Sequence, residues 1–139
     1  MKHIILFNFF ISSFMLGVIF VNQFVNYPLL LIFDKNNIQK FHRHYVNKIS
    51  IIVVPGMILE LIVAILLIYN SVSLSILNLF FLFIIYLSTF CIQVPIHETI
   101  KLESNRLIIN NLVSTNWIRT FAWFLKCVIS FNIIIKELI

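Results

Sequence analysis

The chain has 139 residues, of which 61% are hydrophobic and only 11% are charged, and its mean hydropathy is +1.05. A water-soluble domain of this length carries far more charge on its surface. The net charge of +5 does not indicate nucleic-acid binding, because the basic residues are few and flank apolar runs, as topology-setting charges do. The composition therefore predicts an integral membrane protein with a single transmembrane domain over residues 1–139.

The first apolar run predicts a membrane span over about residues 4–24. A basic start before an apolar run resembles a signal peptide, but the run reaches Phe24 without a small-residue cleavage site, so we interpret it as a retained span. Spacings of three and four residues align one stripe along this helix: Asn8, Ser12, Met15, Ile19, Gln23 and Asn26. Because lipid cannot satisfy polar groups, we expect the stripe to face the bundle interior.

The connection after the first span is predicted to cover residues 27–48. Tyr27-Pro28 should end or kink the first helix, and the Asp-Lys-Asn-Asn cluster at residues 34–37 indicates a loop. The basic, histidine-bearing residues 38–48 are expected to begin a helix that continues into the membrane.

The second span is predicted at about residues 49–69, with a kink at Pro55-Gly56 and with Glu60 near its middle. A tight uncharged turn, residues 70–73, should follow.

The third span is predicted at about residues 74–94, with Pro95 marking its end and a second connection over residues 95–112. Its polar residues again share one face: Tyr86, Thr89, Gln93 and His97. The fourth span is predicted at about residues 113–135. Its spacings of 3, 4, 3 and 4 give the clearest stripe in the chain: Asn116, Arg119, Trp123, Lys126 and Ser130.

Four spans of roughly 20 residues, each able to cross a ~30 Å hydrocarbon layer, predict an all-α bundle with both termini on one side. Of the ten Lys and Arg residues, seven lie near the long connections and two near the termini. The positive-inside rule then places residues 27–48 and 95–112 in the cytoplasm and both termini outside. We expect a multi-pass protein of the plasma membrane, which in a bacterium is the inner membrane.

Three charged side chains lie within the predicted spans, where each costs on the order of 2.5–3.5 kcal/mol at a helix centre. Helical rise places Glu60 and Lys126 at similar depths, and Arg119 nearer the cytoplasmic end. Glu60 is therefore expected to pair with Lys126, or with Arg119 through a longer reach. The pair either sets helix register as a structural ion pair or belongs to a ligand cavity or proton path.

The polar and aromatic residues near the predicted cytoplasmic end form a candidate site. We expect His97 and Arg119 to act in any chemistry. The expected ligand-binding residues are Gln93, Asn116, Trp117, Trp123 and His44. A metal or haem site would use His97 together with His42 or His44. No spacing in the sequence matches a metal-binding motif, so no metal or other cofactor is predicted. Interfacial histidines bonded to lipid headgroups or loops are the simpler interpretation.

Two motifs, VPIHETI at residues 94–100 and TNWIRTFAW at 115–123, give the chain a resemblance to a known family. They resemble segments of the anthrone oxygenase-like family of small four-span membrane proteins, in which the third span ends in a Val-Pro-apolar-Asn pattern and the fourth opens in Trp-Asn-x-x-Arg-Thr. His97 stands where that family has Asn, and Trp117 follows Asn116 instead of preceding it. The oxygenase members of the family imply oxidation of a phenolic polycycle without an obvious metal site.

These features leave three functional hypotheses. In the first, the cytoplasmic cluster binds, and in an enzymatic form oxidises, a small lipophilic quinone- or phenol-like ligand. In the second, the protein is a non-catalytic membrane scaffold or subunit. In the third, it is a small proton-coupled transporter that uses Glu60. The expected partners are membrane lipids, the small ligand and a second copy of the chain.

Overall fold

A computed structural model describes residues 1–32, 35–103 and 105–139, and regular structure in this part of the chain is entirely helical. Its elements are α1 (Lys2–Val21), the π-helical η1 (Asn22–Asn26), α2 (Tyr27–Leu29), α3 (Lys35–Tyr69), α4 (Ser75–Ser88), the π-helical η2 (Thr89–Gln93), α5 (Val94–Leu102) and α6 (Arg106–Leu138). These elements form four rods: α1–η1–α2, α3, α4–η2–α5 and α6.

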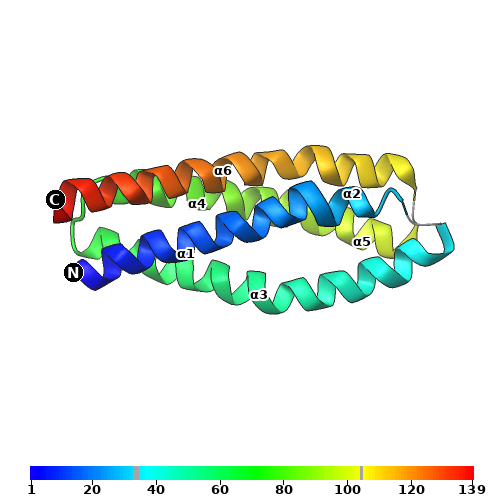
Figure 1. Ribbon diagram of the computed structural model, residues 1–139, viewed down its shortest axis with the longest axis horizontal. Coiled ribbons are helices and arrows are strands. Elements are labelled where there is room, and N and C mark those ends of the chain that lie inside the picture. The colour runs from blue at the N-terminus through cyan, green and yellow to red at the C-terminus, as the bar shows by residue number, and fades with distance from the viewer. Residues whose placement is uncertain (33–34, 104) are drawn as a thin grey trace.

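The four rods lie side by side, with both termini and the turn between α3 and α4 at one end (Figure 1). Each rod is long and apolar enough to cross a membrane. The predicted all-α bundle of four spans is therefore confirmed.

The helices extend beyond the predicted spans. Residues 27–48 and 95–112 were expected as connections, with a helix beginning in residues 38–48. That helix is present as α3, which begins at Lys35, and α5 and α6 occupy most of the second segment. The prediction that Pro95 ends the third span is wrong. The polar residues outside the apolar windows simply continue the helices, because water or headgroups can solvate an exposed polar helix face. Part of the predicted loop at residues 34–37 lies outside the described residues.

Two prolines explain where the π-helical segments occur. η1 ends two residues before Pro28, and η2 ends two residues before Pro95. Proline has no N–H to bond to the carbonyl four residues earlier, and its ring crowds that carbonyl. A wider π turn accommodates the ring, so the helix continues instead of ending. The extra residue also changes which side chains face inward, since Asn22, Gln23 and Tyr27 are all buried.

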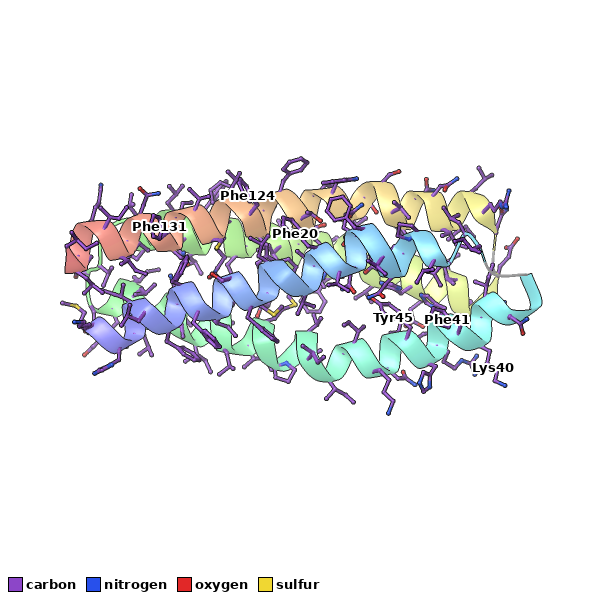
Figure 2. All side chains as sticks on the ribbon, in the orientation of Figure 1. Phe20, Lys40, Phe41, Tyr45, Phe124 and Phe131 are labelled. Carbon is purple, nitrogen blue, oxygen red and sulfur yellow. The ribbon has the colours of Figure 1, made fainter. Side chains whose placement is uncertain are left out.

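The bundle is apolar outside and partly polar inside. Large hydrophobic side chains project from its outer surface, among them Phe20, Phe124 and Phe131 (Figure 2). The α6 stripe is buried along its whole length, as the sequence predicts, and so are Asn8 and Ser12 of α1 and Gln23 of η1. Lipid can solvate the outer surface, and the polar groups must bond to one another within the bundle.

The long helix α3 is bowed (Figure 1) and contains Pro55. It packs on α1 through Gly56, where an added Cβ would meet the Met15 sulfur at less than contact distance. Met15 is itself almost fully buried. The missing side chain at Gly56 therefore permits the close approach of α1 and α3.

Gly56→Val is expected to lower the free energy of unfolding by about 1–3 kcal/mol, because overpacking displaces the buried Met15. Gly17→Val is the matched control, since an added Cβ at Gly17 meets nothing within 4 Å. Both substitutions change helix propensity equally, so thermal unfolding in detergent isolates the packing effect. Equal destabilisation by the two variants would contradict the packing account.

Candidate functional site

A column of buried polar side chains runs along the bundle interior and connects an ion pair in the middle to a cavity nearer the α2 end. The central network comprises Asn8, Ser12, Glu60, Asn78, Trp123, Lys126 and Ser130. The cavity lies further along the bundle, nearer α2. Arg119 lies between the central network and the cavity.

Glu60 of α3 and Lys126 of α6 form an ion pair at 2.8 Å, and both side chains have 0% exposure. The second Glu60 oxygen accepts from Trp123 Nε1 at 2.9 Å, and Lys126 Nζ also donates to Ser12 Oγ at 2.7 Å. Each charge is therefore held by its partner and by a neutral hydrogen-bonding group. These contacts join α1, α3 and α6 in the part of the bundle where lipid offers no alternative partner.

Ser130 joins the central network to α4. Its hydroxyl accepts from Asn8 Nδ2 at 2.9 Å and from Asn78 Nδ2 at 2.8 Å, and it donates to the Lys126 carbonyl at 2.9 Å. Ser12 Oγ is also 3.3 Å from the Ser130 hydroxyl. The contacts of Ser130 therefore link α1, α4 and α6. All four helical rods are thus connected through one set of buried polar contacts.

Arg119 lies one turn of α6 beyond Trp123. Its guanidinium carbon is 5.3 Å from the Trp123 ring centroid, which is a cation–π contact, and the residue is 4% exposed. The guanidinium also lies within electrostatic reach of the Tyr27 hydroxyl. Arg119 therefore joins the central network to the cavity.

The cavity has a volume of about 180 Å³ and lies between α3 and the α4–η2–α5 rod. Most of its lining surface is apolar, and seven of the lining residues are apolar: Val46, Ile49, Val53, Val54, Met57, Phe90 and Val94. Its polar lining comes from Asn22, Tyr27, Ser50, Thr89, Gln93, His97, Glu98 and Arg119. Apolar walls with a few polar groups are typical of sites for small molecules.

Two polar atoms of the cavity lining have no hydrogen-bond partner among the described residues: Gln93 Oε1 and Arg119 Nε. The orientation of the Gln93 amide follows from its neighbour. Thr115 Oγ1 donates to the Asn111 carbonyl at 2.6 Å, so it must accept from Gln93 Nε2 at 2.9 Å, which leaves Oε1 unpaired. Gln93 and Arg119 line the cavity, so one acceptor and one donor, both buried and without a partner among the described residues, belong to side chains beside it.

The two inner histidines bond to each other. His42 Nε2 and His97 Nδ1 are 2.7 Å apart, their rings stack with centroids 5.0 Å apart, and His97 Nε2 is 3.4 Å from the Tyr27 hydroxyl. Nitrogens that share a proton at 2.7 Å do not leave room for an ion between them, because each Zn–N bond needs about 2.0–2.1 Å. Within the described residues, no group of three His, Cys, Asp or Glu side chains could hold a metal ion.

The structure brings together some of the predicted site residues and separates others. Gln93, His97 and Arg119 line the cavity. Asn116 and Trp123 are buried behind it: Asn116 donates to Gln23 Oε1 at 2.8 Å, and Trp123 belongs to the central network.

The other two predicted ligand-binding residues lie at the outer surface of the bundle, away from the cavity. Trp117 is 37% exposed and packs edge-on against Phe24 at 5.5 Å, and His44 is exposed on the outer side of α3. Helical spacing placed Trp117 and His44 in the half of the bundle away from the termini, as the structure has them, but could not determine which side of each helix faces the cavity.

Sequence reasoning missed the contributions of Asn22, Tyr27, Tyr45 and the α3 wall. The stripe of the first span, extended at helical spacing, points to Asn26, whereas η1 shifts the inward face to Asn22 and Tyr27. Tyr45 then donates to Asn22 Oδ1 at 2.6 Å. Pro28 was the available signal, because a proline inside a continuing helix favours a π segment just before it.

No family model matches the chain, and comparisons with curated proteins and with solved structures also find no match. The class is therefore defined by the structure itself: the described residues form a multi-pass, all-α membrane protein built as a four-helix bundle.

Lys126→Met is expected to lower the free energy of unfolding by about 3–5 kcal/mol, because it leaves the Glu60 carboxylate buried and unpaired. The double variant Glu60→Gln/Lys126→Met should be more stable than Lys126→Met alone, since the glutamine is neutral and still accepts from Trp123. Unfolding in detergent with denaturant measures both, and Lys136→Met at the exposed end of α6 is the control. A double variant less stable than Lys126→Met would contradict this role of the pair.

Proposed function

We propose that the cavity binds a small lipophilic, quinone- or phenol-like ligand. The observation that carries the proposal is that two residues lining a cavity of mostly apolar surface, Arg119 and Gln93, each hold a buried polar atom without a partner among the described residues, Nε and Oε1. A ligand carbonyl accepts from Arg119, a ligand hydroxyl donates to Gln93, and the ring lies against the α3 wall. Binding then satisfies buried groups that are otherwise left unpaired.

The wall composition supports entry of the ligand from the bilayer. Phe90 and Val94 on one side of the cavity and Val54 on the other are exposed on the outer surface of the bundle. A lipophilic molecule dissolved in the membrane therefore reaches the cavity between α3 and the α4–η2–α5 rod without crossing water.

The resemblance to the anthrone oxygenase-like family extends the proposal to oxidation of a phenolic ligand. In that reaction the two O–H bonds of a hydroquinone-like ligand break and a quinone forms; one proton passes through His97, and molecular oxygen takes up the two electrons and two protons to become hydrogen peroxide. His42 and Tyr27, both within hydrogen-bond distance of the His97 ring, hold the orientation of that ring. Ligand binding is the part of the proposal supported by geometry, and oxidation is the part supported by the resemblance.

The remaining proposals concern the setting. We place the end of the bundle with residues 27–48 and 95–112 in the cytoplasm and both termini outside, in a plasma or bacterial inner membrane, because most Lys and Arg residues lie in or near those two segments. The proposed partners of the bundle are membrane lipids and a second copy of the chain.

Specific observations also support two other functions, a non-catalytic scaffold or subunit and a proton-coupled transporter. The complete pairing of Glu60 and Lys126 is what a scaffold or subunit needs to hold its helices in register. The continuous polar column is the feature that favours proton-coupled transport, and Glu60→Gln should then abolish pH-dependent transport in a folded protein. Four helices alone enclose a narrow path, so that function would use a dimer.

Isothermal titration calorimetry with two probes tests the ligand proposal. Arg119→Gln should weaken binding of 1,4-naphthoquinone, which only accepts hydrogen bonds, by roughly tenfold, whereas Gln93→Leu should weaken binding of 1-naphthol, which donates one, by a similar factor. Each substitution should affect the other probe much less. Trp117→Phe, outside the cavity, is the control for both.

If Arg119→Gln does not fold, the Gln93→Leu measurement with 1-naphthol still tests the proposal. Gln93 carries no charge, and its replacement leaves the cation–π contact of Arg119 and Trp123 intact. Unfolding temperatures identify a loss of the fold. Absence of binding by either probe to the wild-type protein, or equal effects of the two variants on both probes, would overturn the proposal.

A further inference from the structure

We propose that the exposed basic face of α3 is a binding site for the headgroup of an anionic phospholipid. This basic face consists of two neighbouring rows at i, i+4, i+8 spacing: Gln39, Arg43 and Asn47, and Lys40, His44 and Lys48. It lies on the outer side of the bundle and is separate from the ligand cavity, to which none of these six residues contributes.

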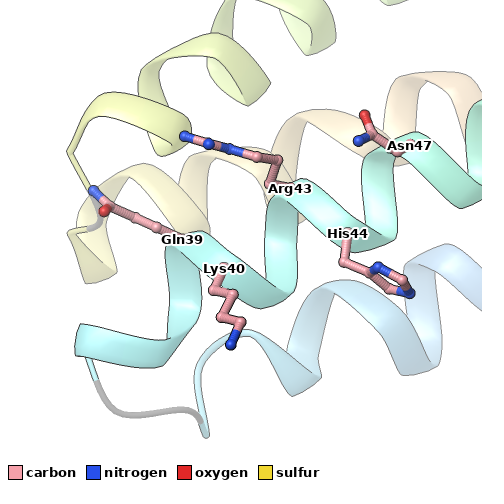
Figure 3. Close-up of a pocket in the computed structure, with 5 residues that line it drawn as sticks. All are labelled: Gln39, Lys40, Arg43, His44 and Asn47. Carbon is pink, nitrogen blue, oxygen red and sulfur yellow. The ribbon is translucent and has the colours of Figure 1, made fainter.

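The two rows border a shallow groove of about 420 Å³ (Figure 3). Lys40 and His44 point to one side of the helix, and Arg43 and Asn47 point to the other, so the groove between them has cationic and amide edges (Figure 3). Gln39 is held in place because its Nε2 donates to the Leu102 carbonyl at 3.0 Å, which also fixes α3 to the end of α5. A phosphate with adjacent hydroxyl groups matches guanidinium, ammonium and amide donors together.

The positive charge of the basic face is not neutralised within the described residues. The ion pairs there are Lys101 with Glu98 and Lys126 with Glu60, and neither involves this face. The sequence has no Asp or Glu between Lys35 and Leu59. Lys40, Arg43 and Lys48 are all exposed, so their charges are accessible to an external anion.

The continuation of the same rows identifies the anion as a lipid. Further along α3 the outward side chains become apolar, with Ile51, Val54 and Ile58 exposed by 68%, 53% and 52%. This change marks where the helix enters the hydrocarbon layer. Lys48 and Arg43 then lie roughly 5–12 Å beyond Ile51 at 1.5 Å per residue, which is the depth of the headgroups. A lipid can place its phosphate on the basic face and its acyl chain along Ile51–Ile58.

Native mass spectrometry of the full chain with equimolar phosphatidylglycerol and phosphatidylcholine tests the site. Lys40→Gln/Arg43→Gln should reduce the preference for phosphatidylglycerol about tenfold or more, since each basic residue near an anionic surface contributes roughly fivefold. Lys2→Gln/Lys136→Gln removes the same charge from exposed residues at the opposite end and should leave the preference unchanged. Naphthoquinone binding should be unaffected in both variants.

Equal loss of preference in the two double variants would show that net charge, not this face, selects the lipid. No loss in Lys40→Gln/Arg43→Gln would also overturn the proposal. A competition experiment adds inorganic phosphate at millimolar concentration. Displacement of phosphatidylglycerol by phosphate alone would assign the basic face to a free anion instead of a lipid. The variants lie on the surface, and equal unfolding temperatures establish that they are folded.

Discussion

The pairing of Glu60 with Lys126 is the constraint on which the rest of this bundle depends. Two full charges with 0% exposure can remain in a membrane interior only if each has a partner, so the helices that carry them must keep their depth and rotation. Trp123 and Ser12 complete the hydrogen bonding of the pair and add α1 to the constraint. Ser130 brings in α4 through Asn78. The fold is therefore fixed by polar contacts in the interior, because apolar contacts with lipid do not select one helix arrangement.

The same constraint positions the cavity. Arg119 follows Lys126 and Trp123 on one face of α6, so the register that aligns the ion pair also places the guanidinium beside the cavity. The prolines at positions 28 and 95 add the second element, since the π segments before them bring Asn22, Tyr27 and Gln93 inward without ending the helices. An arginine donor and a glutamine acceptor are thus left unpaired on residues that line a cavity of mostly apolar surface. This is the physical basis of the proposed ligand site.

The sequence was sufficient for the fold class and for the inward face of α6, because a strict 3, 4, 3, 4 spacing of polar residues in an apolar helix has one physical solution. It also reduced the candidate partners of Glu60 to Lys126 and Arg119, since depth follows from helical rise, and the structure shows Lys126. It was insufficient where the helix departs from 3.6 residues per turn: η1 exchanges Asn26 for Asn22 and Tyr27. It was also insufficient for Trp117 and His44, whose side of the helix depends on how neighbouring rods pack. The orphaned Gln93 oxygen depends on a hydrogen bond from another rod and has no sequence signal.

The most direct measurement of the central claim is the small-molecule content of the protein as it leaves the membrane. Wild-type protein extracted in mild detergent and its Gln93→Leu variant would be purified in parallel, and bound molecules would be quantified by liquid chromatography and mass spectrometry. The account predicts a lipophilic molecule with a carbonyl or hydroxyl end, near one per chain in the wild type and strongly depleted in Gln93→Leu. A wild-type protein that carries no such molecule, or a Gln93→Leu variant that retains it fully, would contradict the account.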